Sequence, residues 1–168
     1  MSAPLALAER FGELTEALLE ACHAVYAKRL VSLAVFGSVG RGTPRPDSDL
    51  DVLLVVEPLP DGRMARVEEF EAVERQMSEA FAAAAQHGVR TRLSPVVKTP
   101  DEVGLGSPLF LDLVEDADVL FDRDAFLAAE LDRLRRRLAE LGARRIWRGN
   151  AWFWDLKPDY RPGDEFEL

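Results

Sequence analysis

The sequence predicts a single α/β domain in which two apolar strands alternate with two long amphipathic helices. Residues 30–36 and 50–56 are short apolar runs flanked by Gly, Pro and charged residues, which is typical of buried strands. Residues 4–29 and 63–86 carry apolar side chains at steps of three and four, the spacing of one helical face. Strands that alternate with helices of this kind favour helices packed in layers on a sheet.

The two strands are separated by a loop of distinctive composition. The first strand ends at Gly37, and residues 37–48 are rich in Gly, Pro and Arg. LDVLLVV, residues 50–56, is apolar on both faces, so we expect it to be a central strand. The turn into the second long helix is made by Pro58, Pro60 and Gly62.

The remaining elements are shorter. Residues 89–97 predict a third strand, and Pro95 places it near a sheet edge or a bulge, because proline cannot donate a ladder hydrogen bond. Further along the chain we expect a helix, a strand and a helix, at about 107–115, 119–121 and 124–141.

The C-terminal residues, 143–168, have no clear period and are rich in aromatic residues and Pro. We interpret residues 1–168 as one domain, with 143–168 as an arm that packs on it. Four aromatic residues fall within eight positions of this arm: Trp147, Trp152, Phe153 and Trp154. They indicate either a clasp that packs the arm onto the domain or a stacking platform for a base or a partner.

Composition excludes several classes of protein. The formal net charge of -9 argues against a general nucleic-acid binder that works by counterion release. The single cysteine, Cys22, excludes a disulfide framework and a Cys-rich zinc site. The chain has no signal-peptide pattern and no apolar run that approaches the roughly 18–20 residues of a membrane span. We therefore expect a soluble, cytoplasmic protein with no membrane partner.

The charge is unevenly distributed. Residues 123–148 hold eight arginines against four acidic residues, a local net charge of +4. This pattern indicates either a solvated helix face or a docking surface for an acidic partner or a phosphate-rich ligand.

Two carboxylates open the second strand. Asp49 and Asp51 are two positions apart, so their side chains are expected on the same face of the strand. Such a pair repels unless a cation or a shared proton lies between the two groups, and an unpaired charge entering a core is costly. Mg²⁺ favours one or two carboxylates and completes its shell with water and phosphate oxygens. The pair therefore predicts a magnesium site.

The turn after the first strand provides groups for an anion. A strand that ends at Gly37 and enters a helix leaves free backbone N–H groups, which together with the Ser38 hydroxyl favour phosphate binding. Arg41 and Arg45 can offset the charge of a triphosphate. Metals that bridge phosphates opposite such donors are the arrangement that phosphoryl transfer requires.

Gly37-Ser38, ten intervening residues and Asp49-x-Asp51 between two apolar strands resemble the signature of the DNA polymerase β-like nucleotidyltransferase superfamily. The pattern is most similar to that of the minimal nucleotidyltransferases often encoded beside HEPN-domain proteins. The resemblance implies a small mixed, mostly antiparallel sheet flanked by helices. It also implies that Gly37 and Ser38 hold the triphosphate while Asp49 and Asp51 hold the metals and act in catalysis.

The resemblance further implies an activity, and at one position this chain departs from the pattern of the family. The implied reaction transfers a nucleoside monophosphate, AMP from ATP, to a hydroxyl of a HEPN-type partner protein, in an antitoxin role; a small molecule such as an antibiotic is another acceptor. A third carboxylate in full catalysts would fall two residues before Ser94, where this chain has Arg92. Asp101 or Glu102 could replace it only if the chain folds back. Arg92 favours the alternative of a catalytically weak protein that neutralises its partner by binding.

Overall fold

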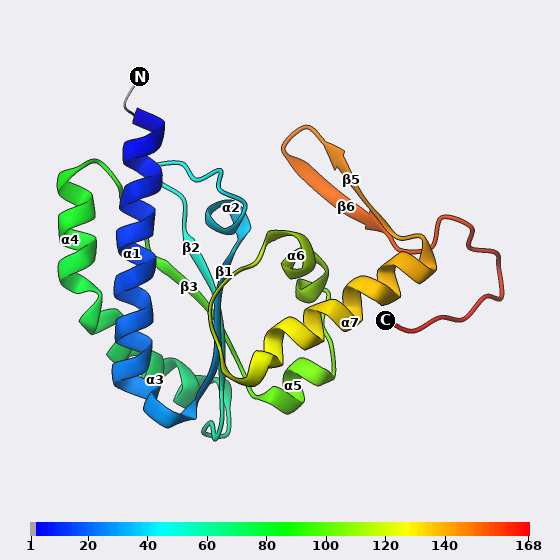
Figure 1. Cartoon of the computed structure of the whole chain (residues 1–168), viewed down its shortest axis with the longest axis horizontal. Coiled ribbons are helices and arrows are strands. Elements are labelled where there is room, and N and C mark those ends of the chain that lie inside the picture. The colour runs from blue at the N-terminus through cyan, green and yellow to red at the C-terminus, as the bar shows by residue number, and fades with distance from the viewer. Residues whose placement is uncertain (1–2) are drawn as a thin grey trace.

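The computed structural model describes the backbone of residues 3–168 and the side chains of residues 7–168. Its centre is a four-stranded sheet in the order β3-β2-β1-β4 (Figure 1). Strand β1 is antiparallel to β2 and β4, and β2 is parallel to β3, so the predicted mixed, mostly antiparallel sheet is confirmed. The strand bounds are β1 Leu30–Phe36, β2 Leu50–Val56, β3 Leu93–Lys98 and β4 Asp118–Asp122.

Helices cover both faces of this sheet (Figure 1). One face packs against α1, Ala3–Tyr26, with α3, Arg63–Gln76, and α4, Ser78–Gln86. The other face packs against α6, Leu109–Asp116, and α7, Phe126–Leu141. Of the helices in residues 3–168, none combines the length and apolar character needed to cross a bilayer.

Successive side chains of β2 point to opposite faces of the sheet, and both faces are covered, which explains why this strand is apolar on both faces. Val52 and Leu54 belong to the core beneath α1, whereas Leu53 and Val55 belong to the core beneath α6 and α7. All four side chains are fully buried. By the same two-residue period, Asp51 falls on the α6 side of the sheet.

Some boundaries differ from those predicted. The helix expected over 63–86 is divided into α3 and α4 at Met77, which is buried and makes a turn between them. The third strand begins at Leu93 rather than 89, because the Arg90 amide bonds to the carbonyl of Pro46 outside the ladder. As Pro95 indicated, β3 is an edge strand.

A short helix that was not predicted, α5, Pro100–Gly104, follows β3. It has a capping box: Thr99 Oγ1 accepts from the Glu102 amide, and the Glu102 carboxylate accepts from the Thr99 amide. The sequence Thr-Pro-Asp-Glu at 99–102 carries the signal for this helix start.

The arm contains regular structure that the aperiodic sequence did not predict. Strands β5, Arg144–Arg148, and β6, Ala151–Asp155, form an antiparallel hairpin beside α6 and α7 (Figure 1). Gly149 and Asn150 make its turn, with φ 62° at Gly149. A Gly-Asn pair between two strands is a hairpin signal, and here it was the one feature that could have indicated the element.

Candidate functional site

The site begins where β1 ends. Phe36 pairs with Asp51 across the antiparallel ladder, so the next residue, Gly37, lies beside the Asp51 side chain. A Cβ placed on Gly37 would lie 2.3 Å from Oδ2 of Asp51, and the φ of Gly37 is +64°. Only glycine satisfies both requirements, the left-handed backbone and the close approach of a carboxylate. The one-turn helix α2, Gly37–Gly40, starts from this point.

The surroundings of Asp51 disfavour its ionised form. Burial raises the pKa of Asp51 above its ordinary value, the Ser94 hydroxyl on β3 acts against that rise, and the nearby charge of Asp49 adds to it. The charge of Asp49 therefore acts against ionisation of Asp51, as expected for two carboxylates two positions apart on one strand. This repulsion fits a cation between them, with oxygen ligands of the kind that Mg²⁺ prefers.

No group of three or more His, Cys, Asp or Glu side chains in the described part of the chain is arranged to hold a metal. Two carboxylates are therefore the protein ligands that this site offers. Water and phosphate oxygens would have to supply the rest of an octahedral shell, which is the usual situation for Mg²⁺ at phosphate sites.

Arg92 occupies the position beside Asp49. Because β2 and β3 are parallel and Leu50 pairs with Leu93, the residues just before them, Asp49 and Arg92, also lie side by side. Arg92 Nε and Nη2 donate to the two Asp49 oxygens at 3.1 and 3.2 Å. Arg92 is 82% exposed and Asp49 is 39% exposed, so this ion pair is in contact with solvent and is weak.

Neither Asp101 nor Glu102 replaces the missing acid. Both follow the end of β3, and a parallel strand places that end at the Val56 side of β2, away from Asp51. The five residue steps from Leu93 to Lys98 correspond to roughly 16 Å. Glu102 is instead held by Arg66 at 2.8 and 3.0 Å. The chain does not fold back.

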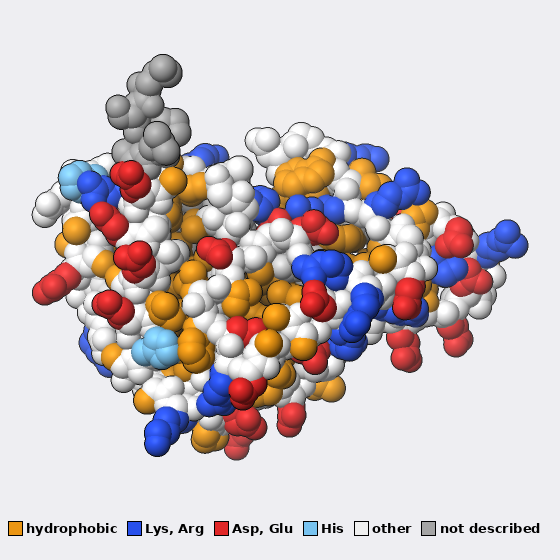
Figure 2. Space-filling view, in the orientation of Figure 1, with side chains coloured by type: hydrophobic (Ala, Val, Ile, Leu, Met, Phe, Trp, Pro, Cys, Tyr) orange, Lys and Arg blue, Asp and Glu red, His pale blue; other side chains and the backbone are white. Residues whose placement is uncertain are grey.

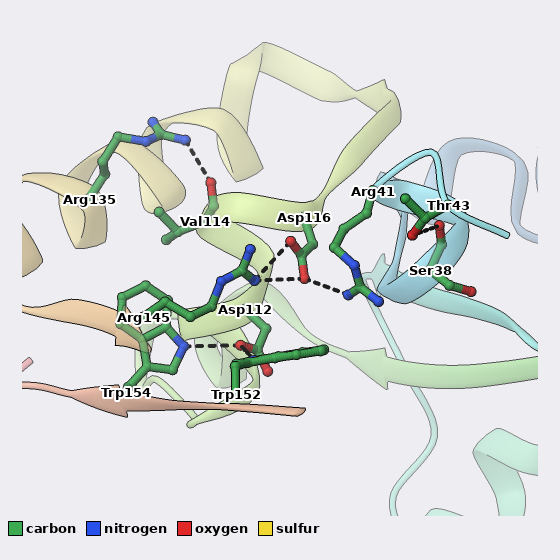
Figure 3. Close-up of polar contacts among 10 residues, drawn as sticks. All are labelled: Ser38, Arg41, Thr43, Asp112, Val114, Asp116, Arg135, Arg145, Trp152 and Trp154. Atoms are coloured by element: carbon green, nitrogen blue, oxygen red, sulfur yellow. Dashed lines mark hydrogen bonds and ion pairs between the residues drawn. The ribbon is translucent and has the colours of Figure 1, made fainter. Parts of the chain in front are cut away.

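A second polar cluster lies on the α6 side of α2 (Figure 3). The carboxylate of Asp116, the last residue of α6, is 2% exposed and accepts from Arg41 Nη1 at 2.9 Å. Arg145 Nη1, from β5, donates to both Asp116 oxygens at 2.9 Å. Sequence reasoning identified Arg41 but not Asp116 or Arg145, because three separate segments contribute to the cluster.

The hairpin is anchored one helical turn earlier on α6. Trp152 Nε1 and Trp154 Nε1 donate to the same oxygen of Asp112, at 2.7 and 3.0 Å (Figure 3). Asp112 and Asp116 are four residues apart and so share a face of the helix. Two of the four aromatic residues of the arm, Trp152 and Trp154, therefore bond to α6, whereas Trp147 and Phe153 are exposed.

A cavity of about 850 Å³ separates α2 from the hairpin. Ser38 and Arg41 line one side, and Arg145, Trp147 and Asn150 line the other. In Figure 2, basic and acidic side chains lie next to one another in the hollow at the top of the molecule, beside the β5–β6 hairpin. Arg45 also lines the cavity; it is 78% exposed and lies 3.4 Å from Asp47.

The predicted residues lie around the Gly37-Ser38 turn. Asp51 lies against Gly37, whereas Ser38, Arg41 and Arg45 line the cavity, and neither Asp49 nor Asp51 is among the residues that line it. Such a region offers two carboxylates for a cation beside cationic and hydroxyl groups for an anion.

A family model and several known proteins are similar to this chain. The family model described as "Nucleotidyltransferase domain" matches residues 16–99, which is half of the chain. The match contains the Gly37-Ser38 turn and the Asp49 and Asp51 pair, and the β5–β6 hairpin lies outside it.

One curated relative comes from Methanocaldococcus jannaschii and is named "Putative protein adenylyltransferase MJ1305". It is 29% identical over 119 residues, which cover 70% of this chain and 76% of the relative. Two solved structures are similar in part. A mutant of the toxin–antitoxin MntA–HpeT shares 15% identity, covers 76% of this chain and 91% of its own, and has a TM-score of 0.47. A toxin–antitoxin with AMP-PNP shares 17% identity over the same shares of the two chains, with a TM-score of 0.44.

Proposed function

This chain belongs to the nucleotidyltransferase domain family, and we propose that it transfers AMP from ATP to a hydroxyl group on a HEPN-type partner protein, with Mg²⁺ as cofactor. The observation that carries the proposal is the contact between Gly37 and Asp51. Through this contact, the turn that is suited to phosphate binding lies directly against the carboxylate that is suited to metal binding.

Each residue has a defined part in this proposal. Gly37 and Ser38 bind the triphosphate through backbone N–H groups and the Ser38 hydroxyl, and Arg41 and Arg45 offset its negative charge. Asp49 and Asp51 would hold Mg²⁺, which supplies charge neutralisation at the phosphates when bound. The oxygen of the acceptor hydroxyl forms a bond to the α-phosphorus and its proton passes to water. The bond from the α-phosphorus to the bridging oxygen breaks, and pyrophosphate leaves with the electron pair.

Two further lines support the choice of substrates. The name of the relative from Methanocaldococcus jannaschii specifies an adenylyl group and a protein acceptor, which favours AMP and a protein hydroxyl here as well. The resemblance of the Gly-Ser and Asp-x-Asp pattern to minimal nucleotidyltransferases favours a HEPN-type protein as that acceptor and a toxin–antitoxin role.

Incubation of the chain with ATP labelled on the α-phosphate and a HEPN-type protein encoded beside its gene tests the proposal. Label should pass to the partner in the presence of Mg²⁺ and not in Asp51→Asn. If the partner protein binds the chain but the label stays on ATP in every reaction, the proposed transfer is contradicted.

One observation favours a second function. The Arg92 guanidinium pairs with Asp49 at the place where a third carboxylate would complete the metal site. An arginine cannot accept a proton, so the chain could instead neutralise its partner by binding alone. Under this function, Asp51→Asn would neutralise the partner as well as the wild type does.

A further inference from the structure

We propose that the β5–β6 hairpin forms the second wall of the nucleotide site and that Arg145 binds the phosphates of the nucleotide beside Arg41. The inference rests on the proposed function, because it takes a nucleoside triphosphate as the ligand. It assigns a binding role to a segment that lies beyond the residues matched by the family model.

The first argument is the placement of Arg145. Its guanidinium and that of Arg41 converge on Asp116 from opposite sides, one from β5 and one from the residue that follows α2 (Figure 3). Both arginines line the cavity that also contains Ser38. A ligand phosphate at the Gly37-Ser38 turn therefore extends into a space that Arg145 borders.

The second argument is the number of donors that remain. Arg41 and Arg145 each use only Nη1 on Asp116. Among the described residues, none accepts a hydrogen bond from Nε or Nη2 of either guanidinium. A guanidinium presents five N–H donors, so each keeps a pair suited to phosphate oxygens.

The third argument is charge. Three arginines and two acids line the cavity, and one of these arginines, Arg45, also lies 3.4 Å from Asp47. Arg41 and Arg145 share the one buried carboxylate of Asp116, so the second positive charge has no carboxylate of its own among the ion pairs of the described residues. An anion in the cavity would balance it, and the low exposure of Arg41 and Arg145, 21% and 14%, strengthens that attraction.

The aromatic residues fix the direction of both guanidinium groups. The Arg41 guanidinium lies 4.7 Å from the Trp152 ring centre, and that of Arg145 lies 5.1 Å from the Trp147 ring centre. Stacking on a ring holds a planar guanidinium in one orientation. Asp116 is a positioning residue in this arrangement, because it acts on the phosphates through the two arginines.

The alternation of β5 provides a matched control. Arg145 and Trp147 point toward the cavity, so Arg144 and Arg148 lie on the opposite face of the hairpin. The Arg148 guanidinium lies 5.4 Å from the Phe153 ring centre on that face. Arg148→Ala therefore removes the same charge from the same strand without affecting the cavity.

The test is competition binding against a fluorescent ATP analogue in Mg²⁺, with AMP-PNP and AMP as competitors. Arg145→Ala should weaken AMP-PNP by about 10- to 100-fold, the loss expected for a charge-assisted hydrogen bond. AMP, which lacks the outer phosphates, should be little affected, and Arg148→Ala should match the wild type for both. Asp116→Asn should weaken AMP-PNP selectively, and Arg145→Lys should recover part of the loss.

The outcomes separate this inference from the proposed function. If Asp51→Asn loses AMP-PNP while Arg145→Ala keeps it, the nucleotide site stands and the hairpin has no part in it. Equal losses of AMP and AMP-PNP in Arg145→Ala would show that Arg145 only anchors the hairpin, which overturns the inference. A wild type that binds no AMP-PNP contradicts the proposed function and the inference together. If the thermal melt shows that Arg145→Ala does not fold, AMP-PNP binding by Arg145→Lys is compared with that of the wild type instead. Lysine keeps the positive charge but lacks the planar set of N–H donors of the guanidinium.

Discussion

Oδ2 of Asp51 lies 2.3 Å from the position that a Cβ on residue 37 would take. The conformation of Gly37 and the placement of Asp51 therefore depend on each other. The β1–β2 register, in which Phe36 is paired with Asp51, makes this contact unavoidable once the strands pair. A nucleotide bound at the turn is thereby held next to the carboxylate.

Gly37→Ala should abolish nucleotide binding. The added Cβ meets the Asp51 carboxylate, and the positive φ costs about 1–2 kcal/mol for any residue with a side chain. Gly42→Ala is the control, since Gly42 also has a positive φ, +74°, but open space around its Cβ position. Thermal melts and AMP-PNP titration of the two variants check this. Equal effects in both would show that backbone strain alone matters and that the contact with Asp51 does not.

Asp51→Asn should raise the stability of the protein when Mg²⁺ is absent. Asp51 is partly buried and repelled by Asp49, and the substitution removes one of the two charges. The wild type should in turn gain roughly 2.7 kcal/mol from Mg²⁺-nucleotide at about 100 times its dissociation constant, whereas the variant gains little. Melting temperatures with and without ligand measure both effects, with exposed Asp61→Asn as the control. If saturating Mg²⁺-ATP leaves the melting temperature of the wild type unchanged, the assignment of this site is wrong.

Arg92→Asp should increase AMP transfer to the partner protein. It removes the guanidinium that pairs with Asp49 and places a carboxylate at the third position, where general base assistance is typically worth about 10²–10⁴-fold. Arg92→Ala separates the two effects, because it frees Asp49 without adding a base. Arg90→Asp adds a carboxylate nearby but outside this position. Rapid transfer by the wild type that Arg92→Asp abolishes would mean that Arg92 binds a substrate.

Asp112→Ala should loosen the hairpin on α6, where the contact of Arg145 with Asp116 remains. Two indole N–H groups lose their common acceptor, and hydrogen bonds to a charged group are each worth about 1.5–3 kcal/mol. The tryptophan emission should shift to longer wavelength, and AMP-PNP should bind more weakly if the hairpin carries Arg145 to the cavity. Asp118→Ala, an exposed acid on β4, is the control. Unchanged emission would show that the hairpin is held without Asp112.

Glu102→Gln should lower stability at neutral pH without affecting nucleotide binding. The Arg66 guanidinium and the Thr99 amide hold the pKa of Glu102 below its ordinary value, so the ionised form stabilises the folded state. That contribution is present above the unfolded-state pKa and is lost as the pH falls through the lowered folded-state pKa. Denaturant unfolding of the wild type and the variant should therefore converge in acid. A loss of nucleotide binding in Glu102→Gln would assign Glu102 to the site after all.

The sequence predicted the elements that depend on local pattern. The strands at 30–36 and 50–56 and the strong helical periods were confirmed, because each is set by side chains close together in the chain. The Gly-Ser and Asp-x-Asp spacing led to the nucleotidyltransferase family, which the family model confirms over residues 16–99. The resemblance also indicated Arg92, counted back from Ser94, as the residue in place of a third acid, and the structure pairs it with Asp49.

The second wall of the cavity depended on contacts that no local pattern encodes. Asp116 binds Arg41 across 75 positions and Arg145 across 29, and Asp112 binds Trp152 across 40. In the sequence, Arg145 is one of eight arginines in residues 123–148, and three others, Arg133, Arg135 and Arg137, pair with acids three positions away on α7. Only the docking of the hairpin on α6 distinguishes Arg145, because burial beside a carboxylate depends on where two distant segments meet in space.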